Sequence, residues 1–180
     1  GADHSPGPRR AVESLLGLGH RRIAMISGGR RNRVGRDRSR GYADALAQAG
    51  VDSDPALLRL DSFEADYGYR ETQWLLAQAN PPTAIVALGS HLLGGVLSAL
   101  RMKGVAVPRQ MSLVASNDSE LAQLATPAIT VIRYDSYQLG REAALLPLRR
   151  LEGKVAPGAQ ARVEIPTEFV LRESCAAPPA

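Results

Sequence analysis

Residues 82–90, with the sequence PTAIVALGS, decide the fold class of this chain. Their apolar part stops abruptly at Gly89-Ser90, and a second apolar run, residues 112–115, stops in the same way at residues 116–118 (SND). Short apolar runs of this kind are typical of strands buried in a parallel sheet. Because ligands bind such sheets beyond the carboxyl ends of the strands, the two endings predict a binding site.

Signals for strands and helices alternate along most of the chain. Strands are predicted at residues 22–27, 57–60, 84–88, 112–115 and 128–132, and helices at residues 9–18, 37–49, 66–79 and 91–103. Short strands joined by helices of about a dozen residues imply right-handed crossovers and a parallel sheet covered on both faces. The predicted fold class is therefore α/β, with a doubly wound parallel sheet.

The last part of the chain gives weaker patterns. A helix is predicted over residues 136–151, with a kink or an early end at Pro147, because proline lacks the N–H and clashes with the preceding turn. Short β segments are expected at residues 162–165 and 168–171, and residues 176–180 are expected to form a disordered end.

The composition indicates a soluble protein of a reducing compartment. The chain has 180 residues and is 44% hydrophobic, yet it contains no uninterrupted apolar run long enough to cross a membrane. Cys175 is the only cysteine, which excludes an internal disulfide and a cysteine metal cluster. No signal peptide is visible, although the sequence opens with glycine rather than methionine. We therefore expect a cytoplasmic location.

The net charge of +4 is concentrated in one segment. Its arginines are Arg30, Arg31, Arg33, Arg36, Arg38 and Arg40. This cluster could bind phosphates or an anionic ligand, and the alternative is a solvated surface loop. Direct nucleic-acid recognition is disfavoured, since the segment has no aromatic residues for stacking and no helix-turn-helix spacing.

No catalytic or metal-binding motif is present. The nucleophile-elbow pattern Gly-x-Ser-x-Gly is absent, because residues 88–92 (LGSHL) lack the second glycine. Neither a phosphate-binding loop nor a dinucleotide fingerprint occurs. His4, His20 and His91 do not have the spacing of metal ligands. The sequence therefore predicts no enzyme activity, no bound metal and no cofactor.

Seven short motifs, taken together, carry a resemblance to a known family. They are residues 19–24 (GHRRIA), 38–42 (RSRGY), 82–84 (PTA), 104–108 (GVAVP), 112–114 (SLV), 126–130 (TPAIT) and 171–174 (LRES). In this order and spacing the chain resembles the effector-binding region of bacterial transcription regulators of the lac-repressor family. The resemblance implies a periplasmic-binding-protein-like fold, with two α/β subdomains joined by crossing strands and an effector between them.

The resemblance also implies how the chain is divided. Residues 20–131 plus 155–174 correspond to the C-terminal, effector-binding subdomain. Residues 1–19 and 132–154 correspond to remnants of the N-terminal subdomain. The helix-turn-helix DNA-binding domain of the family has no counterpart in this sequence, so we expect an N-terminally truncated product.

Two effector positions of the family match motifs of this chain. Arg38, in the Arg-x-x-Gly-Tyr pattern, matches the arginine that reaches polar groups of the effector. Phe63 matches an aromatic position that packs on the face of the effector. The alternatives are that Arg38 caps or pairs at the start of its helix, or is neutralised by Asp61 or Asp118, and that Phe63 is ordinary core.

Other positions depart from the family pattern. Gly89 and Ser90 stand where the family commonly has Asn-Asp, and Asn117 stands where the family has a carboxylate. Asparagine can both donate and accept hydrogen bonds, whereas a charged aspartate only accepts, so ligand preference should change. Tyr134 and Ser136 occupy crossover positions that face the cleft in relatives.

The function implied is ligand-responsive transcription regulation. This chain would bind a small-molecule effector, sugar-like or an anionic metabolite, and would form a homodimer. Operator DNA would be contacted only through the missing N-terminal domain, and no membrane is involved. The alternative is a solute-binding protein of a transport system with the same fold.

Overall fold

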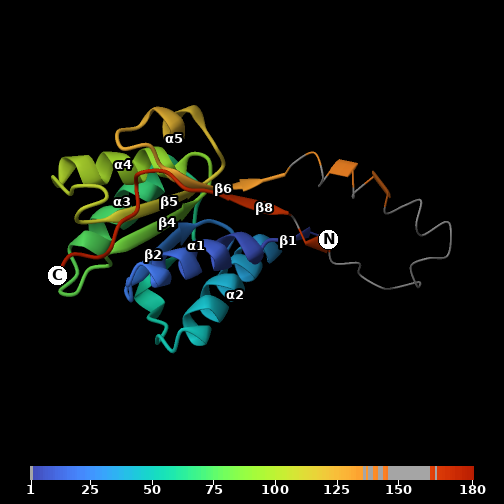
Figure 1. Cartoon of the computed structure of the whole chain (residues 1–180), viewed down its shortest axis with the longest axis horizontal. Helices are drawn as coiled ribbons and strands as arrows, with labels where there is room; N and C mark the ends of the chain where they lie inside the picture. Colours follow the sequence, from blue (N-terminus) through green and yellow to red (C-terminus); the bar gives the residue numbers. More distant parts are fainter. Residues whose placement is uncertain (1, 136, 138–139, 142–143, 146–162, 165) are drawn as a thin grey trace.

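The computed structural model describes residues 2–135, 137, 140–141, 144–145, 163–164 and 166–180. Its main feature is a six-stranded sheet with the strand order β3-β2-β4-β5-β6-β8 (Figure 1). The strands are β2 (Ile23–Ser27), β3 (Leu58–Arg59), β4 (Ala84–Leu88), β5 (Ser112–Ser116), β6 (Thr130–Tyr134) and β8 (Thr167–Val170). All run parallel except β8, which lies antiparallel to β6 at one edge. A short parallel pair joins β1 (Ala2–Asp3) to β7 (Val163–Glu164).

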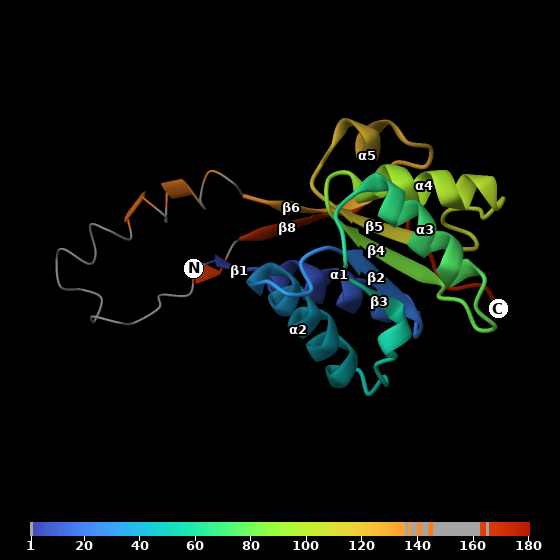
Figure 2. The ribbon, with the colours of Figure 1, turned by 180° about the vertical axis from the view of Figure 1, so that it is seen from behind.

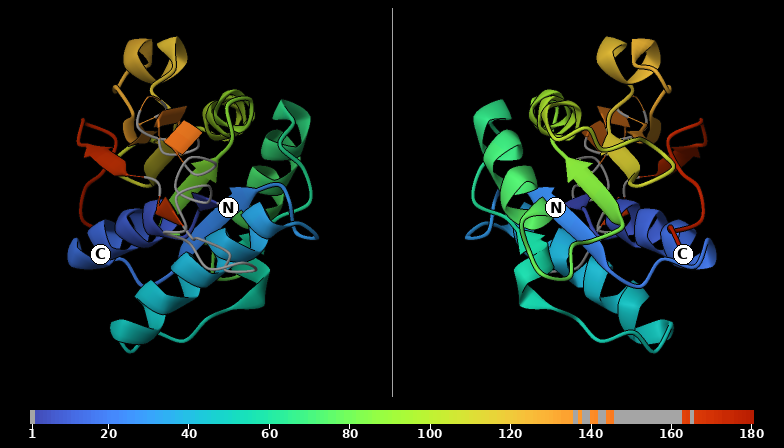
Figure 3. Two further views of the ribbon diagram at one scale, coloured as in Figure 1. Left: turned by 90° about the vertical axis from the view of Figure 1, so that its right-hand side faces the viewer. Right: turned by 90° about the vertical axis from the view of Figure 1, so that its left-hand side faces the viewer.

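Helices cover both faces of the six-stranded sheet, as Figures 2 and 3 show from behind and from the ends. One face carries α1 (Pro6–Gly17) and α2 (Arg33–Gln48). The other face carries α3 (Ala65–Leu76), α4 (Leu92–Met102) and α5 (Glu120–Leu124). Within the described ranges, no helix combines the length and the apolar character of a membrane span.

Side chains that alternate along the strands divide the core into two halves. On β2, Ile23 and Met25 pack with α1 and α2, whereas Ala24 and Ile26 pack with α3 and α4. Every residue of β2, β4 and β5 is buried. Strands covered on both faces need apolar residues at consecutive positions, which explains the continuous runs in the sequence. The prediction of a doubly wound α/β fold is confirmed.

Two helices differ from the expectation because of their caps. Helix α2 begins at Arg33 rather than residue 37, since the side chain of Asn32 accepts a hydrogen bond from the N–H of Gly35 at 3.1 Å. Helix α5 was not predicted at all. It is short, and the hydroxyl of Ser119 caps it by accepting from the N–H of Ala122 at 3.2 Å. Both caps use a polar residue in the segment that follows a strand.

The segment after β8 is held against the sheet, so the prediction of disorder is wrong for Ala176. Its N–H donates to Ser112 Oγ at 3.0 Å, and its carbonyl oxygen lies 2.8 Å from His20 Nε2. The other ring nitrogen, Nδ1 of His20, lies 2.7 Å from Thr83 Oγ1. His20 thus joins the starts of two strands to the end of the chain.

Helix α1 packs within the same unit as the sheet. Ala11, Val12 and Leu15 are fully buried and share a core with β2, β4 and α2. No break in packing separates α1 from the rest of the described unit. The division into residues 20–131 plus 155–174 and residues 1–19 plus 132–154 stays a prediction. Most of the helix expected over residues 136–151, including Ser136, lies outside the described residues.

Candidate functional site

The carboxyl ends of β2, β4 and β5 meet at one edge of the sheet. Ser27 at the end of β2 is paired in register with Leu88 at the end of β4, and Ala87 of β4 with Ala115 of β5. Strands β3 and β4 lie on opposite sides of β2, so the direction of winding reverses at this edge. A reversal of this kind is where open α/β sheets bind ligands.

Arg38 reaches this edge from α2. Its Nη1 donates hydrogen bonds to Ser27 Oγ and to the carbonyl oxygen of Leu88, each at 2.8 Å. The residue is only 8% exposed. Burial lowers the pKa of Arg38, but a guanidinium remains protonated at neutral pH because its ordinary pKa is so high. Arg38 is therefore a buried cation that bridges the ends of β2 and β4, rather than a helix cap.

The ring of Phe63 stands over the same edge. Its centroid lies 5.5 Å from Arg38 Cζ, within the range of a cation–π contact. The ring also lies against two glycines, since a Cβ added to Gly28 would fall 2.4 Å from it and one added to Gly89 would fall 3.0 Å from it. Only glycine at position 28 leaves room for the ring. The structure thus brings together Arg38, Phe63 and Gly89, as the sequence led us to expect.

Ser90 and Asn117 form the next part of this edge. The side-chain amide of Asn117 donates to Ser90 Oγ at 3.0 Å, and the N–H of Asn117 donates to the carbonyl oxygen of Ile132 at 2.9 Å. Both Ser90 and Asn117 are exposed. Two neutral side chains therefore replace the pair of carboxylates expected at these positions from the family pattern.

Tyr134, at the end of β6, packs beside Arg38. Burial raises the pKa of the Tyr134 hydroxyl, and the positive charge of Arg38 opposes this effect. The hydroxyl lies close to the backbone of Gly7 in α1, where an added Cβ would fall 2.8 Å from it. Tyr134 therefore connects the candidate site to the start of α1.

Three polar atoms at this edge are buried without a hydrogen-bond partner in the described part of the chain. They are Nε of Arg38, the hydroxyl of Tyr134 and Oγ of Ser116, the last residue of β5. Unpaired buried polar atoms are uncommon in folded proteins and often mark functional sites. Two of these atoms are at the ends of the neighbouring strands β5 and β6 and the third comes from α2, which supports a binding role for this edge.

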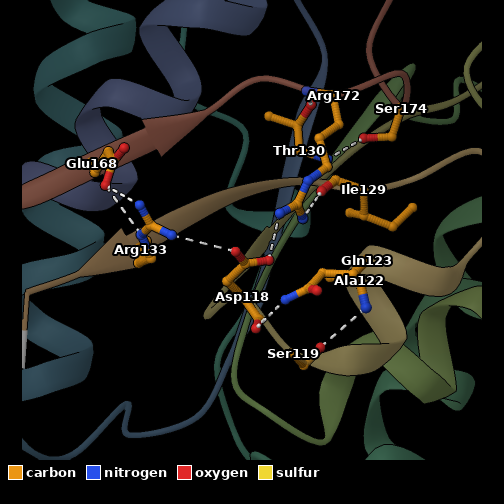
Figure 4. A network of polar contacts seen from close by, with 10 residues as sticks. All are labelled: Asp118, Ser119, Ala122, Gln123, Ile129, Thr130, Arg133, Glu168, Arg172 and Ser174. Atoms are coloured by element: carbon orange, nitrogen blue, oxygen red, sulfur yellow. Dashed lines mark hydrogen bonds and ion pairs between the residues drawn. The ribbon is translucent and has the colours of Figure 1, made fainter.

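Asp118 forms ion pairs with two arginines other than Arg38 (Figure 4). Arg172 Nη2 lies 2.6 Å from Asp118 Oδ1, and Arg133 Nη1 lies 3.6 Å from Asp118 Oδ2. Arg133 also pairs with Glu168. The alternative in which Asp118 neutralises Arg38 is therefore wrong, and Asp61 does not do so either, since it pairs with Arg30.

Three of the six arginines of the cluster, Arg30, Arg33 and Arg40, are engaged with carboxylates. Arg33 and Arg40 both pair with Asp37, and Arg40 also pairs with Asp3. The start of α2 borders a hollow of about 460 Å³ lined by Gly29, Arg30, Arg31, Asn32 and Asp61. The arginines of the cluster thus lie partly in helix α2 and partly along the edge of this hollow. Ion pairs offset part of their positive charge.

Ser27 is the site residue that the sequence analysis missed. It ends β2 and accepts the hydrogen bond that positions Arg38, while its own hydroxyl donates to Leu88 O at 3.3 Å. The available signal was a serine as the last residue of an otherwise apolar strand. In the described residues, no group of three or more His, Cys, Asp or Glu side chains is arranged to hold a metal ion.

A doubly wound sheet with these groups at its reversal point defines a ligand-binding α/β domain. Residues 12–175 match the family described as the periplasmic binding protein-like domain, so the chain belongs to this family. The chain is 31% identical over 174 residues to the HTH-type transcriptional repressor PurR of Haemophilus influenzae (strain PittEE), covering 96% of this chain and 52% of PurR.

Solved structures give the same result. A transcriptional regulator LacI from Bacillus cereus subsp. cytotoxis NVH 391-98 matches with a TM-score of 0.85 and 33% identity, over 98% of this chain and 62% of that one. The complex of the transcriptional regulator CelR with cellobiose matches with a TM-score of 0.82 and 33% identity, over 96% of this chain and 52% of that one. The resemblance to the lac-repressor family is confirmed. The chain spans about half the length of PurR.

Proposed function

We propose that this chain is the effector-binding part of a transcription regulator of the lac-repressor type. The observation that carries the proposal is Arg38, a buried cation across the ends of β2 and β4 where the winding of the sheet reverses. The relatives are transcriptional repressors and regulators, and one of them, CelR, forms a complex with cellobiose. This similarity favours a regulator over a solute-binding protein of a transport system.

The proposed effector site has one apolar wall and several polar groups. Its residues are Arg38, Phe63, Gly89, Ser90, Asn117 and Tyr134. Arg38 supplies a rigid fork of donors, and the ring of Phe63 supplies a flat surface for the ligand. Ser90 and Asn117 offer groups that both donate and accept hydrogen bonds. A mainly apolar surface with a few oriented polar groups is typical of small-molecule sites.

The effector would act by binding one arrangement of the regulator more tightly than another. A ligand shifts such an equilibrium only by the difference between its affinities for the two states. In a dimer, this shift changes how two DNA-binding heads match two half-sites. The partners inferred are therefore a small-molecule effector, a second copy of the chain, and operator DNA contacted through a separate domain in the cytoplasm.

Calorimetric titration of this chain with small sugars, sugar phosphates and sugar acids tests the proposal. At least one compound should bind, and Phe63→Ala should weaken that binding by about tenfold or more, because the ring forms the wall of the site. Trp74→Ala is the matched control, since Trp74 packs on Arg59 with the guanidinium 4.3 Å from its ring and is 39% exposed. An affinity that Phe63→Ala leaves unchanged would overturn the proposed site. The absence of binding by every compound would overturn it as well.

A further inference from the structure

Arg38 carries a positive charge that the described residues leave without a carboxylate partner. Its contacts are the hydroxyl of Ser27, the carbonyl oxygen of Leu88 and the ring of Phe63, with the hydroxyl of Tyr134 nearby. All four groups are neutral. A cation that is buried among neutral groups has lost its water without gaining a counter-charge, which is unfavourable.

The carboxylates of the flanking segments are already engaged elsewhere. They are Asp37 in α2, Asp61 after β3 and Asp118 after β5. Their ion pairs are with Arg33 and Arg40, with Arg30, and with Arg172 and Arg133, respectively. Releasing any of them to neutralise Arg38 would break an existing pair, so the charge of Arg38 stays uncompensated within the described part of the protein.

Ser90, Ser116 and Asn117 add hydrogen-bonding groups to this edge but no negative charge. Ser90 and Asn117 bond to each other through hydroxyl and amide groups, and Ser116 Oγ is buried without a described partner. Backbone and side-chain dipoles can orient a ligand here, but they cannot replace a counter-ion. The electrostatic character of the site is therefore set by Arg38.

We propose that the effector of this site is a small organic anion whose phosphate or carboxylate group pairs with Arg38. This inference rests on the function proposed above and narrows it to one class of ligand. Nη1 of Arg38 is occupied, whereas Nε is buried without a hydrogen-bond partner among the described residues. Phosphate and carboxylate oxygens both match the geometry of the guanidinium fork, so the shared feature is the negative charge.

Matched pairs of ligands test this proposal on the 180-residue chain. Glucose is compared with glucose 6-phosphate and with gluconate, and ribose with ribose 5-phosphate, by calorimetry and by thermal shift at constant ionic strength. At least one anion should bind about tenfold or more tightly than its neutral counterpart. The phosphate and carboxylate arms show which anionic group the site accepts.

Two substitutions at one position separate charge from shape. Arg38→Gln should abolish the preference for the anion, whereas Arg38→Lys should keep the preference with weaker binding, because lysine retains the charge without the fork. Arg31→Gln is the matched control, since it removes the same charge from an exposed residue of the same segment and should leave binding unchanged. If Arg38→Gln does not fold, Arg38→Lys still tests the role of the guanidinium, because its binding of the anion should be weaker than that of the wild type.

The outcomes distinguish this inference from the proposed function. Neutral sugars that bind as tightly as their anions overturn the anionic effector but leave an effector site in place. Anion binding that survives Arg38→Gln and is lost in Arg31→Gln assigns the charge effect to the surface and overturns the proposal as well. Absence of binding by every neutral and anionic compound overturns both.

Discussion

The side-chain amide of Asn117 donates a hydrogen bond to Ser90 Oγ at 3.0 Å and joins the segments that follow β4 and β5. Asn117 makes this bond from a backbone φ of 67°, in the left-handed region. Asparagine visits this region far more readily than residues with other side chains. One residue therefore fixes both the backbone turn and the polar surface at the edge of the sheet.

Replacing Asn117 separates these two roles. Asn117→Ala should lower the free energy of unfolding by about 1 kcal/mol or more, because alanine in the left-handed region is strained. Asn117→Gly should cost less, since glycine adopts positive φ freely, although it also loses the bond to Ser90. Urea unfolding of the two variants measures the difference. Equal losses would show that the side-chain bond, and not the backbone conformation, determines stability here.

Gly28→Ala should destabilise the protein by about 1 to 3 kcal/mol, because the new methyl group would collide with the ring of Phe63. The displaced ring should also weaken ligand binding. Gly94→Ala is the matched control, since its methyl group would lie 3.7 Å from Leu121 and would replace a glycine inside helix α4. That variant should be stabilised by about 0.5 to 1 kcal/mol. Thermal unfolding of both variants checks the opposite signs.

Arg172→Met should lower the free energy of unfolding by about 2 to 3 kcal/mol. The substitution removes a hydrogen-bonded ion pair with Asp118, whose side chain is 15% exposed, and the bond from Arg172 to the carbonyl oxygen of Ile129. Arg133→Met should have a much smaller effect, because Arg133 is half exposed and lies farther from Asp118. Chemical denaturation of both variants tests the order, and a larger loss for Arg133→Met would contradict it.

Stability should fall as the pH drops below 6.5, in part because of His20. Burial lowers the pKa of His20 from its ordinary value of 6.5, so the unfolded chain binds a proton more readily than the folded one. The penalty is absent above pH 6.5 and grows as the pH falls toward the lowered pKa. His20→Asn should therefore flatten the pH dependence of the free energy of unfolding in this window.

His4 provides the comparison for that experiment, because burial also lowers its pKa. His4→Asn removes the contribution of His4 and leaves that of His20. Unfolding curves of the wild type and both variants, recorded between pH 5 and 8, separate the two contributions. Identical slopes for the wild type and His20→Asn would exclude His20 as a source of the pH dependence.

The sequence predicted the strands better than the short helix and the caps. Strand β4 was predicted at its observed bounds, Ala84–Leu88, because burial on both faces leaves a continuous apolar run. Helix α5 was missed because five residues give too little periodicity, and only the cap at Ser119 marks its start. Local patterns thus predict elements that are long or fully buried.

The candidate site was predicted in part. The sequence indicated the strand ends, and the structure brings Arg38, Phe63 and Gly89 together. From the sequence alone, the carboxylate partner of each arginine could not be predicted. The ion pair of Asp118 with Arg172, for example, joins residues 54 positions apart. Ion pairs of this kind depend on the tertiary arrangement, so only the structure could show that Arg38 has none with the described residues.

The hydrogen bonds of residues 174–176 determine when this fold can be completed on the ribosome. Ser174 bonds to strand residues 44 and 61 positions earlier, and the carbonyl of Ala176 meets His20 from 156 positions away. Contacts between such distant positions close late, because the intervening chain must be ordered first. During synthesis, these positions of β5 and β6 therefore stay without their partners until residues 174–176 have left the exit tunnel.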